Sequence, residues 1–397
     1  MAKSKFGYKE SFIITFIIVL SGFVIEYLSG GKGVVLPGFP YNFYILVGFM
    51  VYIIATYKLL PKATIRTLTD IPMTVASISG FTLLVLLMGF LKQDDTAVSP
   101  FVRNLGLSHI NRSWPYMLSA ILLLYILGLV TLKRLNRFTW RNVAFFFNHF
   151  GLWLVIAAAS LGTGDFIRFS MPIDSGEISN LGVTADNTFV KTPFTIKLNK
   201  FTIKTYPSEL VLFDPSNRMI LNNDAQDYSV AQGKVFKHNN LEIKILQYLT
   251  NAQKTQNGFV AAADSIHGQY AALIQVTGKG INKKGWISSG NYQTPATVMN
   301  ISHHIAATLN MPPEKEYISN ISIIDKDTTI NNIDIKVNKP YKYKGFKIYQ
   351  QSYDESKGRW ATTSVLELVR DPWLPVVYSG FIMLIVGSIF MFWLGKK

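Results

Sequence analysis

The chain has 397 residues, of which 49% are hydrophobic and only 16% are charged, against about 25% charged residues in an ordinary soluble domain. This composition excludes a disordered chain, a collagen-like fibre and a typical cytosolic enzyme, and it favours a membrane protein with a sizeable water-soluble part. Because the chain contains no cysteine, disulfides, thiolate metal sites and a nucleophilic thiol are also excluded. The formal net charge is +15, and its distribution is more informative than its size.

Six stretches are apolar and long enough to cross a bilayer, whose hydrocarbon core requires about 20 helical residues. They cover residues 12–28, 43–60, 71–91, 115–132, 143–161 and 374–394. The first follows three lysines, as a secretory signal does, but no small-residue cleavage site comes after it. We therefore interpret it as a retained span.

The charges of the connecting segments predict the orientation of these spans. The amino terminus, the loops after the second and fourth spans, and the carboxyl-terminal tail hold 3 + 3 + 4 + 2 = 12 Lys and Arg residues, whereas the two other short loops hold 4. The positive-inside rule then places both termini in the cytoplasm and the long segment before the last span outside. Because the basic residues lie where topology requires them, they do not indicate nucleic-acid binding.

The segment between the fifth and sixth spans has the pattern of a β domain. Apolar and polar residues alternate over 194–198, 201–204, 241–245, 333–337 and 346–349, which is typical of half-buried strands. Turn signals lie at 214–217, 278–285 and 344–345, where we expect Gly345 to adopt a positive φ. One helix is expected at 294–309, and Tyr349 is expected to pack in the core.

These patterns together predict an α-helical membrane protein with six transmembrane helices and a large extracytoplasmic all-β domain, sandwich- or barrel-like. The expected division is residues 1–165 with five spans, residues 166–371 as the β domain, and residues 372–397 as the sixth span with a short cytoplasmic tail.

Catalytic motifs do not stand out. The sequence has no glycine-rich phosphate loop, no G-x-S-x-G and no H-E-x-x-H, so no catalytic residues are expected. Of the six histidines, His238 and His267 lie in polar, turn-like contexts. His303 and His304 are neighbours on the expected helix and would point about 100° apart, which suits chelation poorly. His109 lies in an expected external loop, where an ordinary structural role is favoured over a ligand role.

His149 is the only histidine placed inside an expected span, about six residues from its cytoplasmic end. An ionisable group in hydrocarbon usually faces a partner or a cavity. One interpretation is a hydrogen bond to a neighbouring helix or to the inner interface. The other is an axial ligand to haem iron, with Trp153 one turn further on stacking against the flat ring. The small residues at 157–164 allow the close approach of another helix, which is the favoured interpretation, or of a macrocycle.

Three segments of the chain resemble the ResB family, also called CcsB, of cytochrome c biogenesis proteins, in the form found in Bacteroidetes-type bacteria. The first is Asn-His-Phe-Gly-Leu-Trp at 148–153, continuing to Gly164 and Asp165. The second, at 337–353, follows the family signature N-x-P-x-x-Y-x-G-x-x-x-Y-Q-x-S-Y. The third is Val-Arg-Asp-Pro at 369–372, which leads into the last span. The resemblance covers most of the chain from about residue 115, while the first two spans are generic.

The resemblance implies a multi-pass protein of the bacterial inner membrane that works with a CcsA-type haem-handling subunit. The pair carries b-type haem, in transit, across the membrane for attachment to apocytochrome c. It implies that His149 matches the family's transmembrane haem histidine, while the external haem histidines belong to the partner. The chain by itself is then a non-catalytic subunit that offers one axial ligand. The alternative is a scaffold without haem, or a transporter subunit, of another envelope complex.

Overall fold

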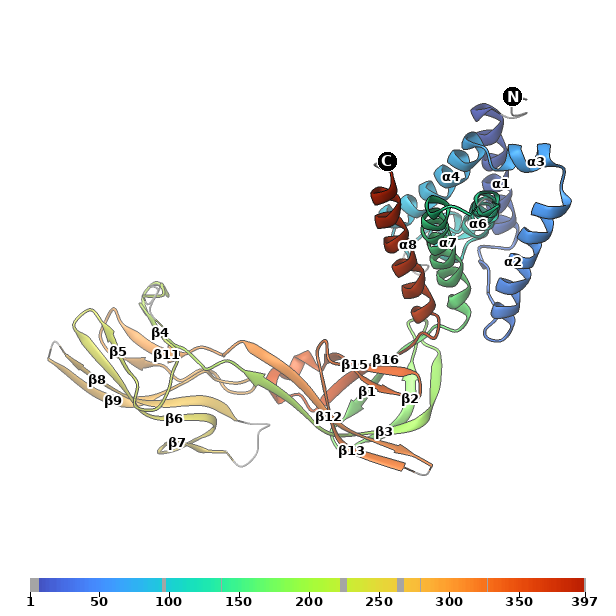
Figure 1. Cartoon of the computed structure of the whole chain (residues 1–397). Helices are drawn as coiled ribbons and strands as arrows, with labels where there is room; N and C mark the ends of the chain where they lie inside the picture. The colour runs from blue at the N-terminus through green and yellow to red at the C-terminus, as the bar shows by residue number, and fades with distance from the viewer. Residues whose placement is uncertain are drawn as a thin grey trace. The chain divides into compact units, whose positions relative to one another are not determined.

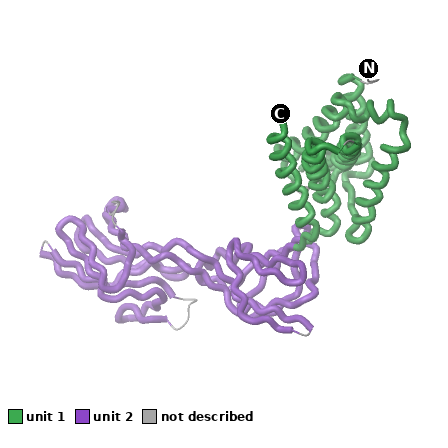
Figure 2. The backbone as a smooth tube through the Cα atoms, viewed as in Figure 1, with its two compact units in different colours: residues 1–167, 370–397 green, residues 168–369 purple. Residues whose placement is uncertain are grey.

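The computed structural model describes residues 7–94, 98–136, 138–221, 227–262, 268–278, 280–326 and 328–395. The chain divides into two compact units, which are distinguished by colour in Figure 2. A helical unit comprises residues 1–167 and 370–397. The second unit comprises residues 168–369, and we call it the outer unit after the orientation that the loop charges predict.

The helical unit contains the six spans expected from the sequence. Its long helices are α1 (Tyr8–Leu28), α2 (Tyr41–Leu59), α4 (Ile71–Phe90), α6 (Trp114–Leu135), α7 (Trp140–Leu161) and α8 (Leu374–Leu394), shown in Figure 1. Each is long and apolar enough to cross a membrane, and proline in the first turn pre-shapes the start of α4, α6 and α8. Short helices connect them: α3 (Lys62–Leu68), α5 (Pro100–Asn104), η1 (Ile110–Arg112) and η2 (Gly162–Gly164).

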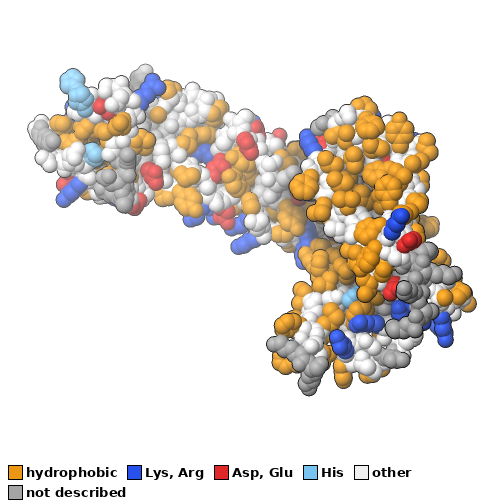
Figure 3. All heavy atoms as spheres, turned by 90° about the horizontal axis from the view of Figure 1, so that it is seen from above, with side chains coloured by type: hydrophobic (Ala, Val, Ile, Leu, Met, Phe, Trp, Pro, Cys, Tyr) orange, Lys and Arg blue, Asp and Glu red, His pale blue; other side chains and the backbone are white. Residues whose placement is uncertain are grey.

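Hydrophobic side chains form broad areas on the surface of the helical unit (Figure 3), as expected of helices whose outer faces meet lipid. Inside the unit, α7 packs closely against α8 because glycines remove the side chains between them. A Cβ atom on Gly387 would lie 2.2 Å from the backbone N of Asn148, and one on Gly151 would lie 2.6 Å from the backbone N of Leu384. Asn148 also donates to the Ser388 hydroxyl at 2.7 Å, which adds a polar link inside the bilayer region.

The outer unit consists of sheets, as expected. Its strands are β1 (Ile167–Asp174), β2 (Ile178–Val183), β3 (Phe189–Thr205), β4 (Leu210–Phe213), β5 (Val235–His238), β6 (Leu241–Thr255), β7 (Gly258–Ala261), β8 (Gln269–Gly278), β9 (Ile281–Ser288), β10 (Met299–Asn300), β11 (Ala306–Leu309), β12 (Glu314–Asp325), β13 (Thr328–Lys336), β14 (Tyr341–Tyr343), β15 (Phe346–Tyr353) and β16 (Thr363–Arg370), with a short helix η3 (Glu355–Trp360).

An eight-stranded sheet runs in the order β13-β12-β3-β2-β1-β16-β15-β14, and β13 approaches β15, so the sheet curls into a nearly closed, barrel-like layer. A five-stranded sheet of β5, β6, β7, β8 and β9 faces a small sheet of β10, β11 and β4. A core between these two sheets buries Leu212, Phe236, Ile243, Ile274 and Leu309. The alternating apolar positions of the sequence thus became the inward faces of antiparallel strands.

The expected helix at 294–309 is wrong. This segment contains β10 and β11, and β11 pairs with β4 from Ala306 opposite Phe213 to Leu309 opposite Leu210. Pairing with a strand almost a hundred residues earlier in the chain overrode the local helical pattern, so the adjacent His303 and His304 lie in the turn between β10 and β11.

The signature segment 337–353 forms the hairpin of β14 and β15. Gly345 has φ +81°, as expected, and Lys344 before it has φ +45°, which gives the positive φ at both turn residues that a tight hairpin requires. The expectation for Tyr349 is wrong by one position: Ile348 and Gln350 are buried and Tyr349 is half-buried on the opposite face. Because strand side chains alternate, a one-residue shift changes the face completely.

Candidate functional site

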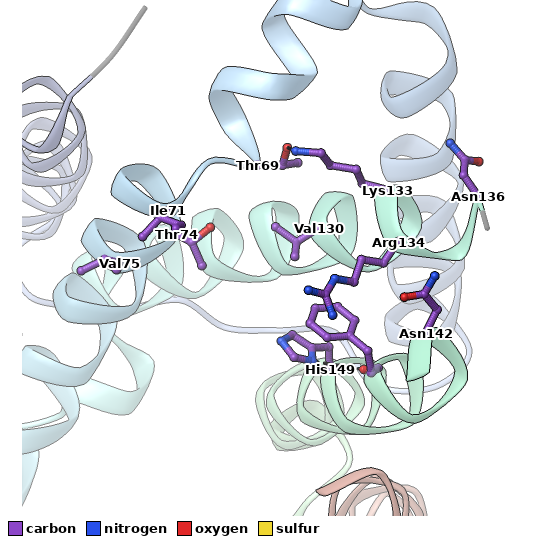
Figure 4. Close-up of a pocket in the computed structure, with 11 residues that line it drawn as sticks. Thr69, Ile71, Thr74, Val75, Val130, Lys133, Arg134, Asn136, Asn142 and His149 are labelled. Atoms are coloured by element: carbon purple, nitrogen blue, oxygen red, sulfur yellow. Dashed lines mark hydrogen bonds between the residues drawn. The ribbon is translucent and has the colours of Figure 1, made fainter. Parts of the chain in front are cut away.

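A cavity of about 640 Å³ opens in the helical unit where α6 ends and α7 begins. This volume lies within the range of about 300–1,000 Å³ that is usual for small-molecule sites. Figure 4 shows the residues that line it. They are Thr69, Ile71, Thr74, Val75, Val130, Lys133, Arg134, Asn136, Asn142, Phe145 and His149.

The start of α7 determines how deep His149 lies. The Thr139 side chain caps the helix by accepting from the backbone N of Asn142, and the helix begins at Trp140, a few residues before the expected start of the span. His149 is therefore nine residues into the helix, or about 13 Å along its axis at 1.5 Å per residue. Its side chain is partly buried and lines the cavity.

Only one of the two ring nitrogens of His149 is engaged within the part of the chain that the structure describes. Nδ1 donates to the backbone oxygen of Phe145 at 3.1 Å, because a carbonyl can only accept. This bond selects the tautomer with its proton on Nδ1 and leaves a lone pair on Nε2, which is the arrangement found in most metal-ligating histidines. The imidazole also stacks on the Phe145 ring, with 3.5 Å between the ring centroids, so its orientation is held from two sides.

Two cations share the cavity with the imidazole. The Arg134 guanidinium lies 4.2 Å from the Phe145 ring centroid, and Figure 4 shows it close to His149. Lys133 donates to the Thr69 hydroxyl at 2.7 Å. The side chains of Ile71, Val75 and Val130 add an apolar wall. The cavity can therefore hold a largely apolar ligand that carries both a metal ion and negatively charged groups.

Trp153 does not share this cavity. It is only 2% exposed, and its indole Nε1 donates to the backbone oxygen of Leu124 at 3.0 Å. It lines a separate apolar hollow of about 200 Å³ between α2, α6 and α7, and it stacks between Phe150 and Phe49. An indole N–H inside a bilayer needs an acceptor, and the nearest carbonyl lies on α6. The structure thus does not bring the two expected binding residues into one cavity.

The other expected histidine of the helical unit, His109, is enclosed rather than exposed. Its ring is 5% exposed, and Nε2 lies 3.3 Å from Oε1 of Glu26, which is completely buried. Glu26 also accepts from the backbone N of Gly33 and of Trp114, both at 2.8 Å. Sequence reasoning missed Glu26, although it is the one charged residue of the first expected span, because two of its partners, His109 and Trp114, lie far from it in the chain.

Asp165, part of the first resembling segment, connects three helices at their outer ends. Its carboxylate accepts from the backbone N of Phe39 at 2.7 Å, from Asn42 at the start of α2 at 2.6 Å, and from the Trp373 indole before α8 at 2.6 Å. Burial raises its pKa, but these three hydrogen bonds together outweigh burial, so the pKa of Asp165 lies below its usual value. The residue therefore holds the ends of α2, α7 and α8 together, and we call its three hydrogen bonds the Asp165 clasp.

The signature residues of the outer unit also form a structural network. Tyr353 donates to both carboxylate oxygens of Glu314, at 2.7 and 2.9 Å, and Tyr343 donates to Asp325 at 2.8 Å. Buried Gln350 accepts from Ser364 at 3.0 Å. Among the described residues, no three His, Asp or Glu side chains come together as a metal site. The signature residues thus join strands of the outer unit to one another through side-chain hydrogen bonds.

Comparison with known proteins supports the resemblance seen in the sequence. Residues 260–363, which run from the end of β7 to the start of β16, match the model of the ResB-like family. No curated protein matches the chain. The match contains the whole signature hairpin, and the ResB-like family is associated with cytochrome c biogenesis. The resemblance is thereby confirmed over this segment of the outer unit.

Proposed function

We propose that this chain is a subunit of an inner-membrane complex that carries haem across the bilayer and helps its attachment to apocytochrome c. The observation that carries the proposal is His149, a partly buried imidazole whose Nδ1 is engaged by Phe145 and whose Nε2 is left to the cavity. The association of the family with cytochrome c biogenesis supports this reading of the cavity.

In this proposal, different residues of the cavity bind different parts of haem. His149 supplies one axial ligand through Nε2, because neutral imidazole binds haem iron well. Arg134 and Lys133 would bind the two propionates, which are the anionic part of an otherwise apolar cargo. Trp153 supports the site only by holding α7 against α6.

The second axial ligand comes from another subunit in this proposal. The described lining of the cavity contains one imidazole, whereas low-spin haem usually takes two axial ligands. A CcsA-type membrane subunit is the expected source, and the chain alone is an incomplete haem site. The cavity opens at the end of the helical unit that carries the basic loops, which the positive-inside rule assigns to the cytoplasm.

A visible spectrum tests the proposal. The chain is purified with a co-expressed CcsA-type partner, and the Soret band is compared between wild type and His149→Ala. We expect the variant to accumulate normally but to lose most of its haem, and added imidazole to restore part of it by filling the vacant axial position. Phe147→Ala is the matched control, since Phe147 lies on the same helix and is exposed.

A normal Soret band and normal cytochrome c output from His149→Ala would refute the haem-ligand role. If the wild-type complex itself contains no haem, the alternative of a scaffold or transporter subunit without haem is favoured instead.

The absence of cysteine makes the orientation testable. Single cysteines are introduced at two exposed positions, Thr328 in the outer unit and Asn136 after α6. In intact spheroplasts, an impermeant maleimide should label the first cysteine, and it should label the second only after lysis. The reverse pattern would contradict the proposed orientation, and the cysteine-free parent chain controls for background labelling.

A further inference from the structure

The outer unit contains a cleft of about 1,080 Å³ that the haem proposal does not use. Residues 200–207, at the end of β3 and just beyond it, line one side of the cleft, and residues 359–362 line another. Tyr248 and Tyr270 from the five-stranded sheet also line it. Of these cleft-lining residues, Tyr270 and residues 359–362 fall in the segment that matches the ResB-like family.

The cleft runs along the end of β3, where, among the described residues, a neighbouring strand pairs with one edge only. β3 extends to Thr205, and β12 pairs with it along this length, with Glu314 opposite Thr205. On its other edge, the pairing with β2 ends where Ile178 lies opposite Lys197.

The backbone of β3 points polar groups into this open side. Phe201 donates its backbone N–H away from β12, to the Ser175 hydroxyl at 3.2 Å. In an antiparallel ladder the direction alternates with each residue, so the N–H and C=O of Ile203 point the same way as those of Phe201. Both residues line the cleft. An edge of this kind is a template for another strand.

The charge of the cleft has one sign. Its described lining includes Lys200, Lys204 and Arg359 and no Asp or Glu. Lys204 is paired with Glu316 at 3.2 Å, so Lys200 and Arg359 are the cations that an incoming group would meet. Arg359 is already positioned: its guanidinium lies 4.0 Å from the Tyr270 ring centroid, and it donates to the backbone oxygen of Thr250 at 2.8 Å.

Trp360 lies beside Arg359 in the same lining, with the guanidinium 5.2 Å from the indole ring centroid. Its side chain is 6% exposed, and within the described structure its indole Nε1 is buried without a hydrogen-bond partner. Trp360 therefore contributes its ring beside Arg359, and not a hydrogen bond to a ligand in the cleft.

We propose that this cleft binds an extended polypeptide segment bearing carboxylates, which adds as a strand to the open edge of β3 between Phe201 and Thr205. Strand addition supplies backbone hydrogen bonds that do not depend on sequence, while Arg359 and Lys200 select acidic side chains. The inference rests on the proposed function in one respect: an unfolded apocytochrome c chain is the client that would present such a segment.

Backbone-modified peptides test this binding mode directly. The full chain, with a single cysteine at exposed Gln232 on the cleft, is labelled with an environment-sensitive dye in nanodiscs. The probe is an eight-residue peptide that alternates Val or Thr with Glu. Two further peptides carry N-methyl groups on odd or on even residues. Because an added strand uses one edge, one N-methyl peptide should bind like the parent and the other should lose binding.

Charge and side-chain variants complete the experiment. Replacing Glu by Lys in the peptide should weaken binding more than about tenfold, and Arg359→Gln should weaken binding of the acidic peptide about tenfold. Lys284→Gln, at an exposed position of β9 outside the cleft, is the matched control and should leave binding unchanged.

Equal binding of both N-methyl peptides, or of the Lys peptide, would overturn the inference. Displacement of the peptide by anionic lipid vesicles would overturn it too, because it would assign the cleft to lipid headgroups. His149→Ala should bind the peptide like wild type. Peptide binding together with a failed haem experiment would therefore refute the proposed function alone, and the converse result would refute only this inference.

Discussion

The two ends of the helical unit each hold a histidine, and the surroundings of the two rings differ. At the outer end, His109 is enclosed, with Nε2 on Glu26 at 3.3 Å and Nδ1 3.4 Å from the Ser108 hydroxyl. At the other end, His149 uses Nδ1 on its own helix and presents its ring to a cavity of about 640 Å³. Both are polar groups in an apolar setting, yet only one keeps a nitrogen for a ligand.

The comparison teaches that burial by itself does not identify a binding residue. A buried polar group whose hydrogen-bonding capacity is filled by its own chain stabilises the fold. Glu26 is such a group, since it accepts from Gly33, His109 and Trp114 and so joins α1 to the start of α6. A group with an unused atom facing a cavity is a candidate for function instead.

The most severe way to break the outer end is Glu26→Ala. The substitution leaves His109 and two backbone amides buried without an acceptor, and breaking a buried pair in this way costs about 3–5 kcal/mol. We expect a large fall in the amount of folded protein, measured as the fraction of the chain that stays folded in detergent and resists protease. Haem per folded chain should not change, and Glu26→Gln should retain part of the stability. A variant with normal stability would contradict the structural role of Glu26.

Removing each imidazole in turn compares the two ends directly. His109→Ala leaves the Glu26 carboxylate without one donor and should destabilise the unit by about 1–3 kcal/mol. His149→Ala removes a partly buried ring with one backbone bond, so its cost should be below about 1 kcal/mol. Thermal unfolding followed by tryptophan fluorescence measures both, and haem content should show the opposite order. The distinction between the two histidines fails if His149→Ala is the less stable variant.

The Asp165 clasp at the outer end predicts a dependence on pH. Its pKa is lowered by hydrogen bonds that hold the ionised form, so its contribution is present above the unfolded pKa of about 3.9 and is lost as the pH falls through the lower folded value. Asp165→Asn should cost about 1 kcal/mol at pH 7. The difference from wild type should shrink below about pH 4. Unfolding midpoints at pH 7 and pH 3.5 provide the measurement, and a difference that does not change with pH would contradict this account.

The smallest expected effect sharpens the description of the inner cavity. Arg134→Gln removes a cation that we assign to a propionate, and we expect haem affinity to fall about 3–10-fold with an unchanged position of the Soret band. The band position reports the axial ligand, so His149→Ala should shift it whereas Arg134→Gln should not. Arg66→Gln is the control, because Arg66 lies on α3 outside the cavity lining. Equal affinity of wild type and Arg134→Gln would remove Arg134 from the site.

Much of the fold could be predicted because its signals are local. Continuous apolar runs predicted all six spans, and period-two alternation predicted strands such as β3, β6 and β13. The helix expected at 294–309 failed because β11 is determined by its pairing with β4. The candidate site was predictable only in part. His149 was identified because it is the only histidine in an expected span, whereas Arg134 was counted only among the basic loop residues that predict the orientation.

What the sequence by itself determined is the class of the protein: a membrane unit, a β unit, the basic loops and one isolated histidine, all read from neighbouring residues. The tertiary structure alone decided which polar groups have their hydrogen bonds satisfied within the chain and which keep an atom available to a ligand. Glu26 meets His109 across 83 residues, Asp165 meets Trp373 across 208, and Trp153 turns to a carbonyl on α6 rather than to the cavity of His149. Hydrogen-bond satisfaction is a property of contacts between distant segments, and these contacts form only when the chain is folded.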